Sequence, residues 1–227
     1  MGGVESGQIN EITPRDGLQN IEGFIPTEAK IRLVDMLVDA GAAFIESTAF
    51  VSPKWVPQLA DAADLLSHPA LHRHVRNSVL IPNQKGFELA RDHGAGEIVF
   101  VLSASEVHNR SNVHKSVEES LDEAASIAAS AAKSGIVPRA NLATAFGYRP
   151  EEIISAERVV EIVTTLDQAG YAGVTLCDTT GVAGPNQVHD LCAKVLAELE
   201  KSTVAVHFHQ CGGIEFANTY AALTAGV

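Results

Sequence analysis

Two histidines near the end of the sequence give the sharpest chemical signal. His207 and His209 flank Phe208 in the run Val206-His207-Phe208-His209. Residues i and i+2 of a β-strand project from the same face, so both imidazoles can converge on one ion. Two neutral imidazoles side by side in a dry strand need polar partners, and a hydrogen-bonded pair at a strand end is the alternative interpretation. The spacing favours a metal site.

Asp16 is the candidate for a third ligand, because it follows the first apolar run of the sequence. In a closed eight-stranded barrel only the eighth strand separates the first strand from the seventh, so Asp16 could reach an ion held by His207 and His209. Two imidazoles and one carboxylate leave coordination positions open for substrate oxygens, and non-haem iron sites use the same set. The alternative is a turn or helix-capping role for Asp16, with Arg15 as its surface partner.

Further charged side chains stand where strands are predicted to end or in the loops that follow. Glu46 and Asp178 each follow an apolar run, and carboxylates are seldom buried without a partner. On one rim they could position Arg15 or tune a base, whereas salt bridges on the rim are the alternative. Lys54 belongs to a loop stiffened by two prolines, which is either a substrate lid or a packed turn.

These residues depend for their positions on short apolar runs that alternate with longer amphipathic runs. Such an alternation predicts a parallel sheet with a helix after each strand. The predicted strands are 8–13, 44–50, 75–82, 97–103, 139–146, 172–177 and 203–209. The predicted helices are 27–40, 56–66, 84–93, 117–133, 155–169, 186–199 and 214–224.

This alternation predicts an α/β protein, a (β/α)₈ TIM barrel of which about seven βα units are present. A doubly wound sheet is the competing architecture, but it usually has a Gly-rich turn after its first strand. Here the segment 13–17 contains a single glycine, Gly17. Polar residues after several predicted strands favour the barrel, whose sites lie at that end. We expect residues 1–227 to form a single catalytic domain that lacks the eighth strand and the C-terminal helices.

Composition narrows the classes of partner. The chain has 46% hydrophobic but only 5% aromatic residues, and 16 Lys+Arg against 28 Asp+Glu give a net charge of −12. A negative field repels nucleic acid and anionic lipid, and no apolar run approaches the roughly 18 residues that span a bilayer. The three cysteines show no CxxC spacing, which indicates a reducing compartment. We expect a cytoplasmic protein without nucleic-acid or membrane partners.

Five segments resemble the hydroxymethylglutaryl-CoA lyase family, in the family's order and spacing. They are residues 14–20, 50–58, 103–106, 177–181 and 207–209. The most specific are the runs Arg-Asp-Gly-Leu-Gln-Asn at 15–20 and Ser-Pro-Lys-Trp-Val-Pro at 52–57. The second run is absent from the related synthases and aldolases of the wider superfamily. The resemblance extends from about residue 8 to the last residue.

The resemblance implies a metal-dependent carbon–carbon lyase, with Mg²⁺ or Mn²⁺ as cofactor and an acyl-CoA as substrate. Such an enzyme cleaves 3-hydroxy-3-methylglutaryl-CoA, or a similar 3-hydroxyacyl-CoA, to acetyl-CoA and acetoacetate, a step of leucine degradation. The cleavage is a retro-Claisen reaction in which the metal acidifies the tertiary hydroxyl and a cation offsets the charge on the thioester. The alternatives are a metal- or acyl-CoA-binding fragment of compromised activity and a related Claisen-type synthase or aldolase.

Carried over position by position, the resemblance implies three groups of site residues. The metal ligands would be Asp16, His207 and His209. The catalytic residues would be Arg15, Glu46, Asp178 and His207, with Arg15 as the cation beside the thioester oxygen. The substrate-binding residues would be Gln19, Lys54 and Thr180.

The sequence also departs from the family pattern. The family continues through an eighth strand, a Gly-rich loop with a reactive cysteine and an Asn metal ligand, none of which occurs before Val227. Ala49, Gln210 and Cys211 stand where the family usually has Ser, Asp or Asn, and Thr. A missing eighth unit would leave strand edges unpaired. We therefore expect a partner chain, as in a homo-oligomer (a dimer), an exchanged segment or further C-terminal residues to cover these edges. We expect weak or no lyase activity from these 227 residues alone.

Overall fold

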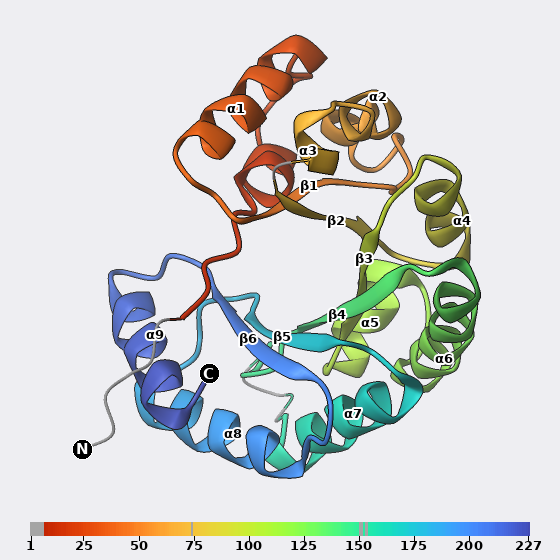
Figure 1. Cartoon of the computed structure of the whole chain (residues 1–227). Coiled ribbons are helices and arrows are strands. Elements are labelled where there is room, and N and C mark those ends of the chain that lie inside the picture. The colour runs from red at the N-terminus through yellow and green to blue at the C-terminus, as the bar shows by residue number, and fades with distance from the viewer. Residues whose placement is uncertain (1–6, 74, 150–151, 153) are drawn as a thin grey trace. The chain divides into compact units, whose positions relative to one another are not determined.

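Parallel strands and helices alternate along the chain in the computed structural model, which describes residues 7–73, 75–149, 152 and 154–227 (Figure 1). Within these residues the strands are β1 (Phe44–Ala49), β2 (Arg76–Ile81), β3 (Glu97–Ser103), β4 (Val137–Ala143), β5 (Gly173–Asp178) and β6 (Thr203–Phe208). The α-helices are α1 (Thr27–Asp39), α2 (Ala62–Leu66), α3 (Ala70–Arg73), α4 (Gln84–Asp92), α5 (Glu106–Val113), α6 (Val117–Ser134), α7 (Ala156–Ala169), α8 (Pro185–Glu198) and α9 (Ile214–Ala225). None of these helices combines the length and the apolar character that crossing a membrane would require.

Tertiary contacts divide the chain into two compact units, and the division falls within β3 and α6. The N-terminal unit consists of Gln8–Phe100 and Ser130–Val137. The C-terminal unit consists mainly of Val101–Ala129 and Pro138–Val227. Each unit has its own ladder of parallel strands and its own buried side chains, so each is described by itself.

In the N-terminal unit β2 pairs with β1 and with β3. The register of β1 shifts between Glu46 and Thr48, so that Ser47 is an extra residue opposite β2. Such a bulge bends a strand locally and re-aims the side chains beside it. One buried cluster in this unit is aliphatic and comprises Val34, Ile45, Leu65 and Leu71.

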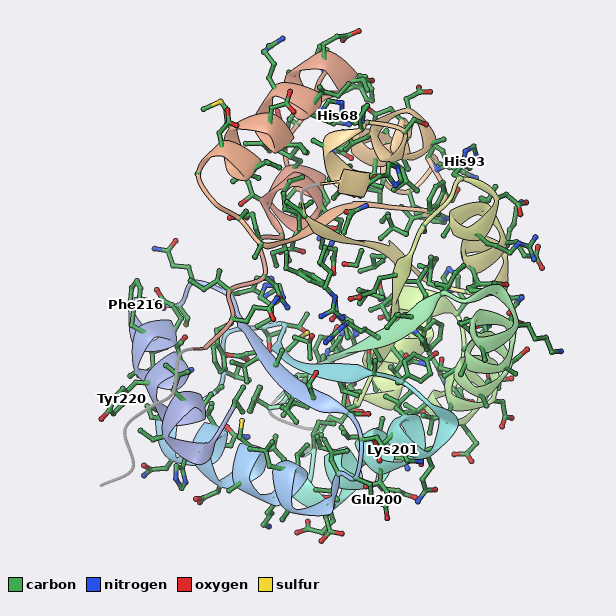
Figure 2. The ribbon with its side chains drawn as sticks, viewed as in Figure 1. His68, His93, Glu200, Lys201, Phe216 and Tyr220 are labelled. Carbon is green, nitrogen blue, oxygen red and sulfur yellow. The ribbon has the colours of Figure 1, made fainter. Side chains whose placement is uncertain are left out.

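In the C-terminal unit β5 pairs with β4 and with β6, from Gly173 opposite Thr203 to Asp178 opposite Phe208. Helix α7 begins at Ser155, whose side chain accepts a hydrogen bond from Arg158 N as an N-cap. It buries the apolar face that its helical spacing predicts, formed by Val159, Ile162, Val163 and Leu166. Helix α9 carries two exposed aromatic side chains, Phe216 and Tyr220, which project outward in Figure 2.

The first predicted strand is wrong, so the described residues contain six strands rather than seven. Within 8–13 only Glu11 pairs, as an isolated parallel bridge with Ile45. The chain then enters a short π-helix, Thr13–Gly17, in which Pro14 has no N–H to donate to a ladder. The predicted helix 56–66 is also divided, into a 3₁₀ turn at Pro57–Leu59 and α2.

Candidate active site

In the N-terminal unit a buried arginine lies between two carboxylates. Arg15 is 5% exposed, its Nε donates to Glu46 Oε1 across 2.5 Å, and its Nη1 donates to Asp16 Oδ1 across 2.5 Å. The π-helix carries Arg15 and Asp16, whereas Glu46 comes from β1, directly before the bulge at Ser47. A buried cation is tolerated when anions and hydrogen bonds compensate its lost hydration. Two carboxylates therefore fix the orientation of the guanidinium beside β1.

Asp16 is fixed from a second side by Gln19, whose Nε2 donates to the same Oδ1 across 3.0 Å. Hydrogen bonds to a carboxylate that is a potential metal ligand set its orientation before a metal arrives. The four residues Arg15, Asp16, Gln19 and Glu46, which the sequence predicted as parts of one site, thus form one hydrogen-bonded network.

Lys54 lies outside that network. It is exposed in the turn after β1, where the N–H groups of Trp55 and Val56 both donate to Ser52 O. Its predicted contact with the substrate stays a prediction.

The base of the Lys54 loop contains a buried ion pair that the sequence did not predict. Lys30 is 1% exposed, and its Nζ lies 2.5 Å from Asp61 Oδ1 and 2.5 Å from Gln58 O. Thr27 Oγ1 donates to the other oxygen of Asp61 across 2.8 Å. The signal that could have revealed it is the position of Lys30 one turn before Val34, on the buried face of α1.

In the C-terminal unit the two histidines of the metal prediction lie together at the end of β6. The ring centroids of His207 and His209 are 4.7 Å apart, with an interplanar angle of 62°. His209 Nδ1 donates to the backbone oxygens of Asp178 and Thr179, across 3.2 and 3.1 Å. In the neutral ring this bond leaves the Nε2 lone pair for a metal. Imidazole nitrogens suit a divalent cation, so this pair of side chains fits such an ion, and their role as metal ligands stays a prediction.

Asp178 and Thr180 hold the loop that follows β5. Asp178 is 1% exposed, and its two carboxylate oxygens accept from Val182 N (2.9 Å) and Ala183 N (3.1 Å). Thr180 is exposed, and its hydroxyl donates to Gly147 O across 3.5 Å. Both residues therefore shape the backbone beside the histidine pair, and their direct roles toward a substrate stay predictions.

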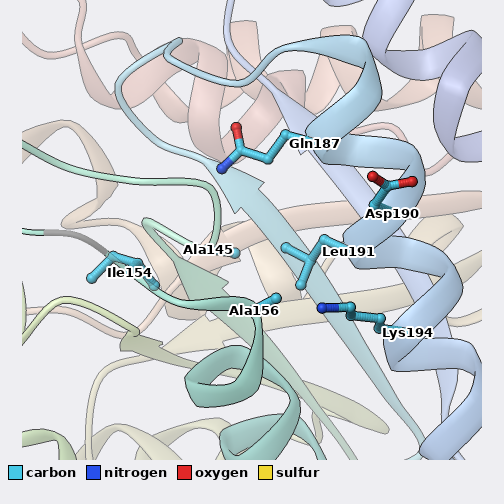
Figure 3. A pocket seen from close by; sticks show the side chains of 7 residues that line it. All are labelled: Ala145, Ile154, Ala156, Gln187, Asp190, Leu191 and Lys194. Atoms are coloured by element: carbon cyan, nitrogen blue, oxygen red, sulfur yellow. The ribbon is translucent and has the colours of Figure 1, made fainter.

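A cavity of about 220 Å³ opens between the start of α7 and the face of α8 (Figure 3). Its lining includes Ile154, Ala156, Gln187, Leu191 and Lys194. None of the predicted site residues lines it, so this cavity belongs to neither group of candidate residues.

Comparisons with known proteins match nearly the whole chain. The model of the HMGL-like family matches residues 7–227. The hydroxymethylglutaryl-CoA lyase YngG of Bacillus subtilis is 39% identical over 219 residues, which cover 96% of this chain and 73% of the relative. The mitochondrial hydroxymethylglutaryl-CoA lyase of Bos taurus is 40% identical over 220 residues, covering 97% of this chain and 68% of the relative.

Solved structures agree with these relatives. The crystal structure of the Bacillus subtilis HMG-CoA lyase superposes with a TM-score of 0.92 at 39% identity, covering 97% of this chain and 74% of that chain. An HMG-CoA lyase from Acinetobacter baumannii, in complex with coenzyme A and 3-methylmalate, superposes with a TM-score of 0.93 at 32% identity, covering 100% and 74%. These matches confirm the predicted α/β barrel class.

Proposed function

The chain belongs to the HMGL-like family, and we propose that it is a hydroxymethylglutaryl-CoA lyase that cleaves 3-hydroxy-3-methylglutaryl-CoA to acetyl-CoA and acetoacetate. The observation that carries this proposal is the buried Arg15, held between Glu46 and Asp16 within a chain about 40% identical to lyases of that name. The solved relative that contains coenzyme A supports an acyl-CoA as the substrate class.

Arg15 would stabilise the negative charge that develops on the thioester oxygen as the carbon–carbon bond breaks. Its guanidinium is already oriented by Glu46, so little reorganisation is needed when that charge appears. A planar guanidinium can also present two parallel N–H groups to the oxygen. Gln19 would fix the position of Asp16 relative to the acyl group, because its amide already donates to Asp16.

We propose one divalent cation, Mg²⁺ or Mn²⁺, with Asp16, His207 and His209 as its ligands. When bound, the cation would lower the pKa of the substrate's tertiary hydroxyl and so favour its deprotonation. His207 would hold the cation beside that hydroxyl, and His209 would present Nε2 because carbonyl oxygens engage its Nδ1. Asp178 would act indirectly, by shaping the loop after β5.

Substrate recognition would need at least one local cation and neutral polar groups, since the chain as a whole carries a formal charge of −12. An anionic acyl-CoA is repelled by such a field unless positive side chains receive it. Lys54, in the turn after β1, and the hydroxyl of Thr180 are the residues that we propose for this contact, together with Gln19.

The test combines metal binding with turnover. Mn²⁺ binding, measured by calorimetry or electron paramagnetic resonance, should be stoichiometric in the wild type and lost in both His207→Ala and His209→Ala. His189→Ala is the matched control, because His189 lies on the exposed side of α8 beside Asp190. Wild-type affinity in both site variants would refute the metal site. Acetoacetate formation no faster in the metal-loaded wild type than in His207→Ala would refute lyase activity in these 227 residues.

A further inference from the structure

Thr144, directly after β4, has an unusual backbone conformation. Its φ is +57°, and among the described residues only His114 shares a positive φ without being glycine. His114 is exposed and ends α5, a common place for that conformation. Thr144 is fully buried and β-branched, which makes a left-handed backbone strained. Strained residues persist when their surroundings fix them, and they gather at functional sites.

The surroundings of Thr144 fix it on two sides. Its Oγ1 accepts from Ser105 N across 3.1 Å and donates to Ala143 O across 2.7 Å. Its own backbone N–H donates to Thr179 Oγ1 across 2.9 Å. Hydrogen bonds therefore connect Ser105, Thr144 and Thr179, which follow β3, β4 and β5.

Thr179 in turn contacts His209, one of the two histidines. Its carbonyl oxygen accepts from His209 Nδ1 across 3.1 Å, and Asp178 O lies 3.2 Å from the same nitrogen. A carbonyl oxygen can only accept, so the ring proton of neutral His209 must sit on Nδ1. Because Thr144 N–H holds the Thr179 side chain, the peptide that carries the acceptor carbonyl is restrained as well.

We propose that Thr144 and Thr179 are positioning residues that set the ring orientation and the tautomer of His209, so that Nε2 is ready for the metal. This inference rests on the proposed function, because it takes His209 as a ligand. Neither threonine was a candidate from the sequence. Outer hydrogen-bond partners of ligating histidines contribute about 10- to 100-fold to metal affinity in other proteins.

The experiment removes the side-chain hydrogen-bond acceptor of Thr179 and keeps the shape of the side chain. Thr179→Val deletes the Oγ1 that receives Thr144 N–H, whereas Thr179→Ser retains it. Thr203→Val is the matched control, since Thr203 Oγ1 donates to Ala172 O across 3.3 Å at the opposite end of the β5–β6 pair. We expect Mn²⁺ affinity to fall about 10- to 100-fold in Thr179→Val and to stay within about twofold of wild type in the other two.

A second measurement does not depend on any variant folding. Long-range ¹H–¹⁵N spectra of the metal-free wild type, recorded where His209 is neutral, should show the proton on Nδ1. A proton on Nε2, or unchanged Mn²⁺ affinity in Thr179→Val, would overturn the inference. The two ideas are separable, because wild-type affinity in His209→Ala would refute the metal site itself, while loss in His209→Ala with normal Thr179→Val would refute only the positioning role.

Discussion

Arg15 and Glu46 form a buried ion pair in which Nε lies 2.5 Å from Oε1 and the side chains are 6% and 5% exposed. Charges so thoroughly removed from water cost several kcal/mol of hydration each, and a replacement by apolar residues is often no less stable. The pair is therefore poorly explained as a stabilising element. Its location beside Asp16 explains it better as a charge held ready for a substrate.

We expect Arg15→Lys to lower kcat by about a hundredfold or more, because an ammonium cannot reproduce the planar, bidentate fork. The measurement is steady-state turnover of 3-hydroxy-3-methylglutaryl-CoA in a coupled acetoacetate assay with saturating Mg²⁺ or Mn²⁺. Arg158→Lys is the control, since Arg158 lies on α7 and pairs there with Glu161, whose side chain is exposed. A kcat close to wild type would mean that Arg15 serves the fold alone.

The Lys30–Asp61 pair gives a prediction about stability. Lys30→Met should lower the free energy of unfolding by about 3–5 kcal/mol, because it leaves the Asp61 carboxylate buried without its cation. The double variant Lys30→Met, Asp61→Leu should recover much of that loss, since neither charge remains. Urea denaturation of the wild type, both singles and the double provides the cycle. A single-variant loss below about 1 kcal/mol would contradict the buried pairing.

His108 predicts a pH dependence of stability. Burial lowers its pKa below the ordinary 6.5, although Glu152 opposes the shift, and Nδ1 lies 2.6 Å from Ser103 Oγ. The unfolded chain then binds more protons below pH 6.5, so the contribution of His108 is complete above that pH and is lost as the pH falls toward the folded-state pKa.

Accordingly, the drop in Tm between pH 7.5 and pH 5.5 should be smaller in His108→Gln than in the wild type. Differential scanning calorimetry at several pH values measures it. His189→Gln, with its side chain about half exposed, should keep the wild-type pH profile. An unchanged profile in His108→Gln would show that the imidazole charges freely in the folded protein.

Asp167 closes the loop between α8 and β6. Its carboxylate accepts from the backbone N–H groups of Glu200 (3.2 Å), Lys201 (3.2 Å) and Ser202 (2.7 Å); the first two side chains are labelled in Figure 2. Burial raises the pKa of Asp167, but these hydrogen bonds outweigh it and lower the pKa below 3.8. The stabilisation is therefore present at neutral pH and is lost as the pH falls through the folded-state pKa.

Asp167→Asn should reduce the free energy of unfolding at pH 7 by about 1–3 kcal/mol, because an amide offers one acceptor oxygen to three donors. Chemical denaturation at pH 7 measures the loss. Asp190→Asn on the exposed face of α8 is the control. Equal losses in the two variants would contradict the role of Asp167 as an acceptor.

Much of the fold could be predicted from the spacing of apolar residues and from the residues that begin or end each helix and strand. The strand 97–103 is observed with the predicted bounds, and the predicted helix 155–169 is observed as α7, with Ser155 as its N-cap. The failure at 8–13 has a physical cause, since a strand needs a continuous partner and only Glu11 finds one, at Ile45. The apolar pattern of a segment does not show how many of its residues will pair with an adjacent strand.

The candidate site, like the fold, was predictable only in part. Arg15, Asp16 and Gln19 were predictable because the motif at 15–20 contains them, and Glu46 because it is a carboxylate after an apolar run. The four side chains form one network. The role that we infer for Thr144 was not predictable, because a left-handed threonine results from bonds to Ser105 and Thr179, far away in the sequence.

The loop after β1 gives the protein an optical probe of its own. Trp55 is the chain's single tryptophan, and 73% of its surface is exposed. Intrinsic fluorescence excited at the indole band therefore comes from one known position in the molecule. A ligand that covers the loop would move this emission toward shorter wavelengths as water leaves the ring. Stopped-flow recording could then time the arrival and departure of acyl-CoA without any attached dye.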